Sequence, residues 1–311
     1  MKLSVLDGDE LVWSGAELDE AGDVDAVGHR IVHGGTEFVD PVVIDADVVR
    51  RLEALTDLAP LHQPKSLEAL KLAEAAFPDV PHVACFDTAF HANLPAAAST
   101  YALPREWRMR WPLRRFGFHG LSHAYASRRA AELTGARRIV TCHLGAGASL
   151  AAVLDGVSVD TTMGFTPLEG LVMATRSGSV DPGLIFWLEE HMGMPPAELA
   201  STLEHRSGLA GLAGTSDMKA VLEAEARGDE DAALAVAVYL HRLRGEIARM
   251  AAALGGVDVL VFTGGVGERS EAIRTRACAG LGFLGDMRVL VVEAREDLEI
   301  ARGVRSALAL E

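Results

Sequence analysis

Two apolar runs that end in glycine clusters constrain the fold most strongly. Arg138–Leu144 and Ala148–Leu154 predict two strands joined by a turn at Gly145–Ala146–Gly147. Val257–Phe262 predicts a buried strand that meets the glycine-rich stretch Thr263–Gly267, with a helix from about Ser270. Strands joined by a tight turn are antiparallel, whereas a strand that leads into a helix is typical of α/β proteins. The sequence therefore predicts an α/β fold with mixed sheets.

The remaining segments continue this alternation of strands and helices. A chain of 311 residues favours two domains. Further strands are expected at Lys2–Leu6, Glu10–Ser14 and Val83–Phe86, with Arg30 on another short apolar run. Helices are expected at Ser66–Ala76, His123–Leu133, Pro182–His191, Pro196–His205, Asp231–Leu254 and Glu296–Leu308.

Charge and composition exclude several classes of protein. The formal net charge is −15 and aromatic residues make up 5%, which disfavours a nucleic-acid partner. Acidic residues follow the first Met closely, and the apolar stretches are short, so we expect neither a signal peptide nor a membrane segment. Cys85, Cys142 and Cys278 lack the spacing of a disulfide framework, which suits the reducing cytoplasm.

The glycine clusters are candidate phosphate-binding elements. Glycines let the backbone approach a ligand closely, and successive N–H groups can bind an anion. Gly145–Gly147 also fits a tight hairpin with nothing bound, and Thr263–Gly267 also fits an ordinary strand-to-helix turn. Because two such segments occur in one chain, they favour a nucleotide ligand more strongly than either segment would alone.

Several charged side chains lie beside turn residues. Arg30 and Arg176 offer planar forks for carboxylate or phosphate, although each also fits a structural salt bridge. Asp87 follows a buried strand, where an acid can position a reacting group or cap a turn. His119, between Phe118 and Gly120, is the strongest functional candidate among the 11 histidines. The histidines lack zinc-ligand spacing, and Ser177 lacks the nucleophile elbow of serine hydrolases.

Taken together, these segments resemble acetate kinase and its short-chain acyl kinase relatives. The matching strings occur in family order from about Leu3 to Arg302. They are GHRIVHGG, LAPLHQP, FDTAFH, RRFGFHGLSH, CHLGAGAS, DTTMGFTPLEGLVMATRSGSVDP, FTGGVGE and EDLEIAR. The resemblance implies two ribonuclease-H-like domains of the sugar kinase/Hsp70/actin type, residues 1–86 plus 296–311 and residues 87–295. It implies transfer of the ATP γ-phosphoryl to a carboxylate in the cleft between them.

The resemblance also implies roles for individual residues. Arg30 and Arg176 match the arginines that grip the acyl carboxylate and the phosphoryl in transit. His119 matches the histidine that stabilises the transferring group, and Asp87 matches the catalytic aspartate. Glu296 matches a glutamate linked to Mg²⁺. The acyl pocket matches Val32, Leu61, Phe118 and Pro167, with His62 as a second active-site histidine. The nucleotide site matches His143, Gly145, Ala146, Gly147, Asp217, Met218, Lys219, Gly265, Val266 and Gly267. A homodimer is implied as well.

The chain departs from the family pattern in four places. The family opens with a strand, an Asn and a Gly–Ser loop upstream of the strand at Lys2–Leu6, so we expect the true start to lie further upstream. Ala146 stands where Asn is usual, and Lys219 stands where an Arg usually stacks on adenine. Ala174 and Ser179 replace Gly and Asp around Arg176.

Three functions remain open from the sequence. The first is an acetate or propionate kinase, two substrates that differ by one methylene and about 1–3 kcal/mol of binding. The second is a kinase of butyrate or branched-chain acids, which needs a wider pocket near Val32 and Phe118. The third is an inactive nucleotide-binding member of the family.

Overall fold

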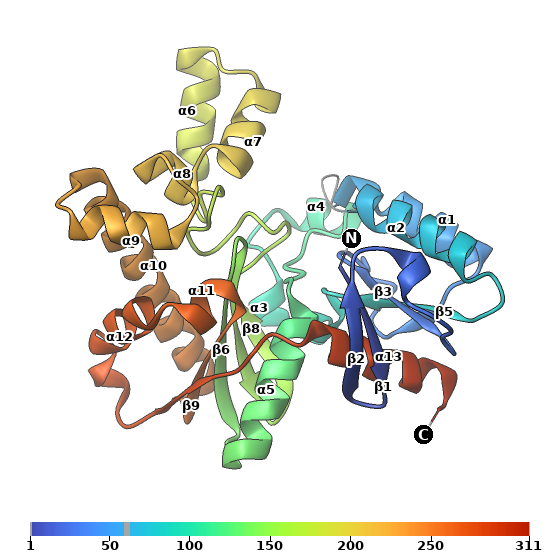
Figure 1. The fold of residues 1–311 in the computed structure, drawn as a ribbon. Helices are drawn as coiled ribbons and strands as arrows, with labels where there is room; N and C mark the ends of the chain where they lie inside the picture. The colour runs from blue at the N-terminus through green and yellow to red at the C-terminus, as the bar shows by residue number, and fades with distance from the viewer. Residues whose placement is uncertain (1, 59–62, 311) are drawn as a thin grey trace.

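A five-stranded mixed sheet forms the centre of the larger lobe in the computed structural model, which describes residues 2–58 and 63–310 (Figure 1). The strand order is β10 (Arg288–Val291), β9 (Val259–Thr263), β6 (Arg138–Leu144), β7 (Ala148–Leu154) and β8 (Val157–Thr161). The first three strands are parallel, and β7 and β8 run antiparallel to their neighbours. The predicted mixed sheet is confirmed.

Both faces of this sheet are covered, which explains why apolar residues follow one another almost without interruption along β7 and β9. Successive side chains of a strand point to opposite faces. Leu260 and Phe262 pack with the helix α10 (Glu230–Leu254), whereas Val259 and Val261 pack with α5 (Gly120–Thr134). Both helices end at a glycine in the left-handed conformation, Gly255 and Gly135.

The smaller lobe is built around a three-stranded sheet. Its order is β3 (Val27–Ile31), β5 (His82–Phe86) and β4 (Val42–Val43), and β3 and β5 are parallel. On one face, α1 (Ala46–Ala54) and α2 (Gln63–Ala76) bury apolar side chains against it. On the other face lies α13 (Glu296–Leu308), which brings the end of the chain back to this smaller lobe (Figure 1).

The N-terminal strands form a hairpin, as predicted. β1 (Leu3–Asp7) and β2 (Glu10–Gly15) pair antiparallel as a separate two-stranded sheet. Gly8 takes a φ of 56° in the turn, and Arg305 of α13 donates a 2.8 Å hydrogen bond to its carbonyl oxygen. The expectation of a further strand upstream is not tested by this arrangement and stays an expectation.

The segment expected to be a glycine-rich loop after β9 is instead helical. α11 (Gly264–Arg269) begins at Gly264, and α12 (Glu271–Ala279) follows the predicted break at Ser270. The carboxylate of Glu268 accepts a 2.8 Å hydrogen bond from the Gly264 N–H. That bond pairs one of the N–H groups that a first helical turn leaves open, and so favours helix over loop.

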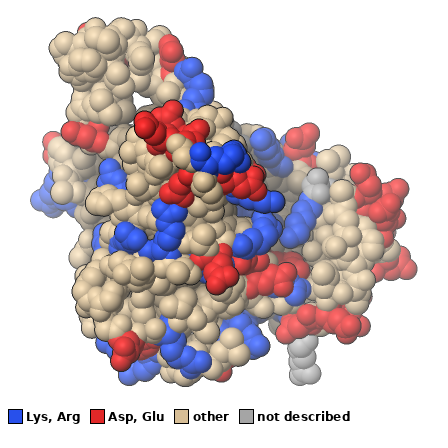
Figure 2. All heavy atoms as spheres, turned by 60° about the vertical axis from the view of Figure 1, so that its left-hand side comes forward, with Lys and Arg blue, Asp and Glu red and all other residues tan. Residues whose placement is uncertain are grey.

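The remaining helices extend the larger lobe. α6 and α7 project away from the sheet (Figure 1), and the tip of this projection is largely uncharged (Figure 2). Within residues 2–58 and 63–310, every helix is too short or too polar to cross a membrane. The elements are α3 (Ala96–Ser99), α4 (Arg105–Arg110), α6 (Pro182–Met192), α7 (Pro196–His205), α8 (Gly208–Ala213) and α9 (Met218–Ala226).

Candidate active site

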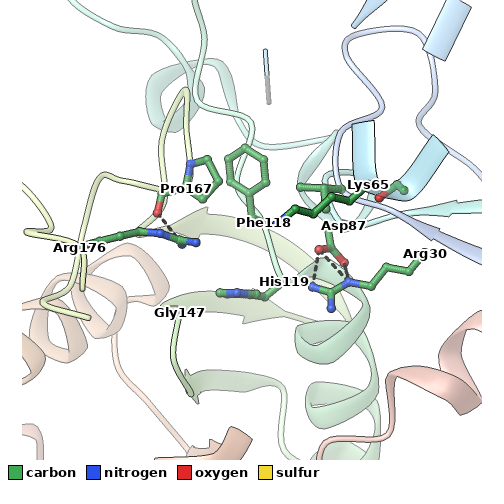
Figure 3. Close-up of a pocket in the computed structure, with 10 residues that line it drawn as sticks. Arg30, Lys65, Asp87, Phe118, His119, Gly147, Pro167 and Arg176 are labelled. Atoms are coloured by element: carbon green, nitrogen blue, oxygen red, sulfur yellow. Dashed lines mark hydrogen bonds and ion pairs between the residues drawn. The ribbon is translucent and has the colours of Figure 1, made fainter. Parts of the chain in front are cut away.

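A pocket of about 330 Å³ lies where the two lobes meet (Figure 3). β3, β5 and α2 supply one wall, whereas the start of α5 and the β6–β7 turn supply the other. Eight of its ten lining residues are predicted site residues, and Lys65 and Ser66 are the two that were not predicted. The eight are Arg30, Val32, Asp87, Phe118, His119, Gly147, Pro167 and Arg176.

Arg30 is fixed by two carboxylates. Because β3 and β5 are parallel neighbours, Arg30 on β3 lies beside Asp87, which follows β5. Its Nε and Nη2 donate to the Asp87 carboxylate at 3.1 and 2.7 Å, and Nη1 lies 3.0 Å from Oε2 of Glu296. Asp87 beside it raises the pKa of Arg30, so the guanidinium is a permanent, oriented cation.

Glu296 begins α13 and completes this group of charges. Burial raises the pKa of its carboxyl, Asp87 adds to the rise and Arg30 opposes it. The described part of the chain has no group of three or more His, Cys, Asp or Glu side chains placed to hold a metal ion. Mg²⁺, however, is usually held by one or two carboxylates together with water and substrate phosphates. Asp87 and Glu296, on one guanidinium, fit that requirement.

His119 adopts a strained backbone conformation at the start of α5. Its φ is 55°, in the left-handed region that few residues other than glycine adopt. The next residue holds it there, because the Gly120 N–H donates a 2.9 Å hydrogen bond to the Asp87 carbonyl. A Cβ at position 120 would collide with that oxygen. Burial lowers the pKa of His119 well below its usual value, and His143 and Arg30 lower it further.

Arg176 faces this group from the opposite side of the pocket (Figure 3). Its Nη1 donates to the Pro167 carbonyl at 3.3 Å, and burial lowers its pKa. A Cβ on Gly147 would lie 3.1 Å from Nε2 of His119 and 3.4 Å from Nη1 of Arg176. The β6–β7 turn therefore approaches both side chains closely because position 147 is glycine.

The apolar end of the pocket is formed by Val32, Phe118 and Pro167. Leu61 and His62, also expected there, lie outside the described residues. Lys65 belongs to the first turn of α2 and extends toward Phe118 (Figure 3). Nothing in the spacing of the sequence marks Lys65 as a pocket residue, because only the packing of α2 against β3 brings it there.

The expected nucleotide-binding residues fall into two groups. Gly145–Gly147 forms the predicted tight turn between β6 and β7, and Gly147 lines the pocket. His143 pairs with Thr263 across parallel strands, so α11 with Gly265, Val266 and Gly267 begins at the same sheet edge. Asp217 instead caps α9, where Met218 is buried and Lys219 is exposed. A nucleotide role for either group stays a prediction.

The fold and the pocket define a class of protein. Two α/β lobes present cations to one shared pocket from opposite sides, and carboxylates and a neutral histidine lie between them. Such a site neutralises and orients an anionic group that moves between two bound ligands, which is the task of a phosphotransferase.

Comparison with known proteins identifies the family. Residues 10–299 match the model of the Acetokinase family. The chain is 48% identical to the acetate kinase of Clavibacter michiganensis subsp. michiganensis, over 97% of this chain and 83% of that one. A propionate kinase structure from Francisella tularensis is similar with a TM-score of 0.87 and 38% identity, covering 90% and 78% of the two chains. An acetate kinase structure from Porphyromonas gingivalis gives 0.86 and 40%, covering 92% and 78%. The chain belongs to the acetokinase family, and its two-lobed α/β architecture is the predicted ribonuclease-H-like one.

Proposed function

We propose that this enzyme transfers the γ-phosphoryl of ATP to the carboxylate of acetate or propionate, giving an acyl phosphate and ADP in a reversible reaction. One observation carries the proposal: Arg30 and Arg176 face one another across a single pocket with His119 between them (Figure 3). The names of the similar proteins, acetate and propionate kinases, support the choice of acceptor. They do not favour a butyrate kinase or an inactive member of the family.

The residues of the pocket suit direct in-line transfer. Phosphoryl transfer needs positioning and charge neutralisation more than covalent chemistry. Arg30, held by Asp87, is oriented before substrate arrives, and Arg176 stabilises charge from the other side. One oxygen of the bound acid then attacks the γ-phosphorus, while His119 contacts the phosphoryl group. The glycines at 145–147 and 265–267 leave room for the phosphates of ATP.

Asp87 and Glu296 would hold Mg²⁺ together with phosphate oxygens and water. When bound, the ion neutralises charge on the phosphates. Burial already raises the pKa of the Glu296 carboxyl, so a nearby cation stabilises its ionised form. The apolar end, with Val32, Phe118 and Pro167, fits a methyl or ethyl group.

The test is acid-dependent formation of acyl phosphate, trapped as a hydroxamate, with Mg-ATP. We expect activity with acetate and propionate, and a fall of roughly a hundredfold or more in Arg30→Ala and Arg176→Ala. Arg50→Ala is the matched control, since Arg50 pairs only locally with Asp47 on the surface of α1. ATP binding without acid-dependent ADP release would contradict the proposal and select the inactive alternative.

We also propose three features of the whole enzyme. Residues 1–86 plus 296–311 form one domain and residues 87–295 the other, because α13 packs on the three-stranded sheet of the smaller lobe. The three cysteines are free thiols, which suits the ATP-rich, reducing cytoplasm. Two copies associate through α6, which exposes Leu184, Phe186, Trp187 and Met192.

A further inference from the structure

A chain of buried polar side chains runs from His119 into the core of the larger lobe. Nδ1 of His119 lies 2.9 Å from Oγ of Ser149 on β7. The same oxygen lies 2.8 Å from Nε2 of His123 on α5. Nδ1 of His123 lies 2.7 Å from Oγ1 of Thr141 on β6, which in turn donates a 3.5 Å hydrogen bond to the Ala151 carbonyl.

These polar residues lie on a sheet face whose other end is apolar. Ile139 and Val153 pack against α5, and Thr141 and Ser149 lie on the same face at the pocket end of the two strands. Thr141, Ser149 and His123 all have 0% exposure. Buried polar groups cost free energy unless they are hydrogen-bonded, and each of these has its partner.

The number of available protons fixes which group donates in each hydrogen bond of this chain of side chains, His119–Ser149–His123–Thr141, which we call the relay. A hydroxyl has one proton to donate, and a neutral imidazole has one donor and one acceptor nitrogen. The Thr141 hydroxyl makes both contacts at once only when its proton points to the Ala151 carbonyl, 3.5 Å away, and Nδ1 of His123 donates to its oxygen at 2.7 Å. Nε2 of His123 then accepts, and the Ser149 hydroxyl donates to it. Ser149 therefore has only an acceptor left for His119.

We infer that Thr141, His123 and Ser149 are positioning residues that place the proton of neutral His119 on Nδ1. Nε2, which faces the turn at Gly147, then carries a lone pair. This inference rests on the proposed function for its meaning: His119 becomes a hydrogen-bond donor to the phosphoryl group only when it gains a second proton on Nε2. Ser149 can keep accepting from Nδ1 in that cationic form, so the relay needs no rearrangement.

The surroundings keep His119 neutral until an anion arrives. Burial lowers its pKa, and the neighbouring cations and imidazoles act in the same direction. Asp87 does not counteract them, because Arg30 already engages its carboxylate. The titratable and charged groups around it are His143 on β6, His123 on α5, Arg30 on β3, Arg176 in the loop after β8, Asp87 after β5, Glu296 on α13 and Lys65 on α2, which lines the same pocket.

The tautomer of His119 is directly measurable by ¹⁵N NMR of the full chain with labelled histidine, and the His119→Gln variant assigns its signals. At neutral pH without ligand we expect the Nδ1–H form in the wild type. Thr141→Val removes the acceptor of His123 at nearly constant shape, so His123 turns its proton to Ser149 and His119 switches to Nε2–H. Thr141→Ser keeps the hydroxyl and keeps Nδ1–H. An Nε2–H wild type, or no change in Thr141→Val, would overturn the inference.

A second variant and an activity assay keep the inference testable if Thr141→Val does not fold. If Thr141→Val does not fold, Ser149→Ala interrupts the relay at its centre, and His119 should then show a mixture of both tautomers; a pure Nδ1–H form there would equally overturn it. In activity assays we expect kcat to fall about tenfold or more in Thr141→Val, with the KM for the acid unchanged and recovery in Thr141→Ser. The NMR result stands even if no acyl phosphate forms, so failure of the proposed function is distinguishable.

Discussion

Gly147 shows how much the pocket depends on a missing side chain. The Gly147→Ala variant places a methyl group 3.1 Å from Nε2 of His119 and 3.4 Å from Nη1 of Arg176, so both must shift by a few tenths of an ångström. We expect a fall in kcat/KM of roughly tenfold or more, because small misplacements of reacting groups are costly. Hydroxamate assays and thermal unfolding check this. Full activity in a well-folded variant would show that the turn does not set the position of either group.

Lys65 tests whether the pocket uses a cation that the sequence did not reveal. Its side chain extends into the pocket from α2, whereas Lys71, on the same helix, pairs with Glu53 at 3.5 Å on the surface. We expect Lys65→Ala to raise the KM for the acid severalfold, because one positive charge near the anionic ligands is lost. Lys71→Ala should leave KM unchanged. Equal KM values in both variants would show that the charge of Lys65 does not contribute to binding of the acid.

Glu296 predicts a pH dependence of stability. Its pKa is raised in the folded protein, so the folded state binds more protons than the unfolded state between the ordinary Glu value of about 4.3 and the raised one. Stability is therefore lost as pH rises through this window. Glu296→Gln cannot titrate, so its melting temperature relative to the wild type should increase across the same window. Parallel melting curves of the two proteins against pH would contradict this.

At the scale of single elements, α10 contains a glycine that lowers the stability of the helix. Gly245 lies in the interior of this long helix, and a Cβ there meets nothing within 4 Å. Glycine in a helix interior costs roughly 0.5–1 kcal/mol relative to alanine, because it loses more backbone entropy on folding. Gly245→Ala should therefore raise the free energy of unfolding by about that amount in urea titrations, with unchanged activity. A destabilised variant would mean that another contact depends on Gly245.

Local patterns predicted the elements well where one physical cause dominated. β6, β7, α7 and α13 have the predicted boundaries, because apolar runs, prolines and charged first turns mark their ends. α11 was missed, since glycine disfavours helix and the hydrogen bond from Gly264 to Glu268 is a single side-chain contact. The strand β8 was missed as well, because its polar residues Ser158 and Asp160 break the apolar pattern and are buried by pairing with β7 and by contacts with His91 and Arg249.

At the scale of the whole molecule, the site comes from segments far apart in the sequence. Arg30 and Arg176 each fitted a structural salt bridge, and Arg30 does form one, with Asp87. Its pocket role becomes visible only when α13 brings Glu296 beside it and the larger lobe presents His119 and Arg176 opposite. Sequence patterns record neighbours along an element, and these contacts between the lobes leave no periodic signal.

The proposed dimer depends on the exposed apolar side chains of α6 in an otherwise acidic molecule. A net charge of −15 keeps two copies apart, so association needs a local apolar contact. α6 has no buried residue, and its Phe186 and Trp187 are 59% and 48% exposed. Exposed apolar patches of this kind mark interaction sites. Sedimentation should therefore give twice the chain mass of 33.0 kDa.

Single charged substitutions distinguish a specific α6 interface from non-specific association of apolar surfaces. Phe186→Asp and Trp187→Asp should give monomers, because each buries a charge in the contact, and neither side chain supports the fold of its own chain. Phe283→Asp is the matched control: Phe283 is 71% exposed but lies far along the chain, after α12, and this variant should stay dimeric. Ten residues of a single chain line the pocket, so we expect the monomers to keep their activity. A monomeric wild type, or dimers of Trp187→Asp, would rule out α6 as the interface.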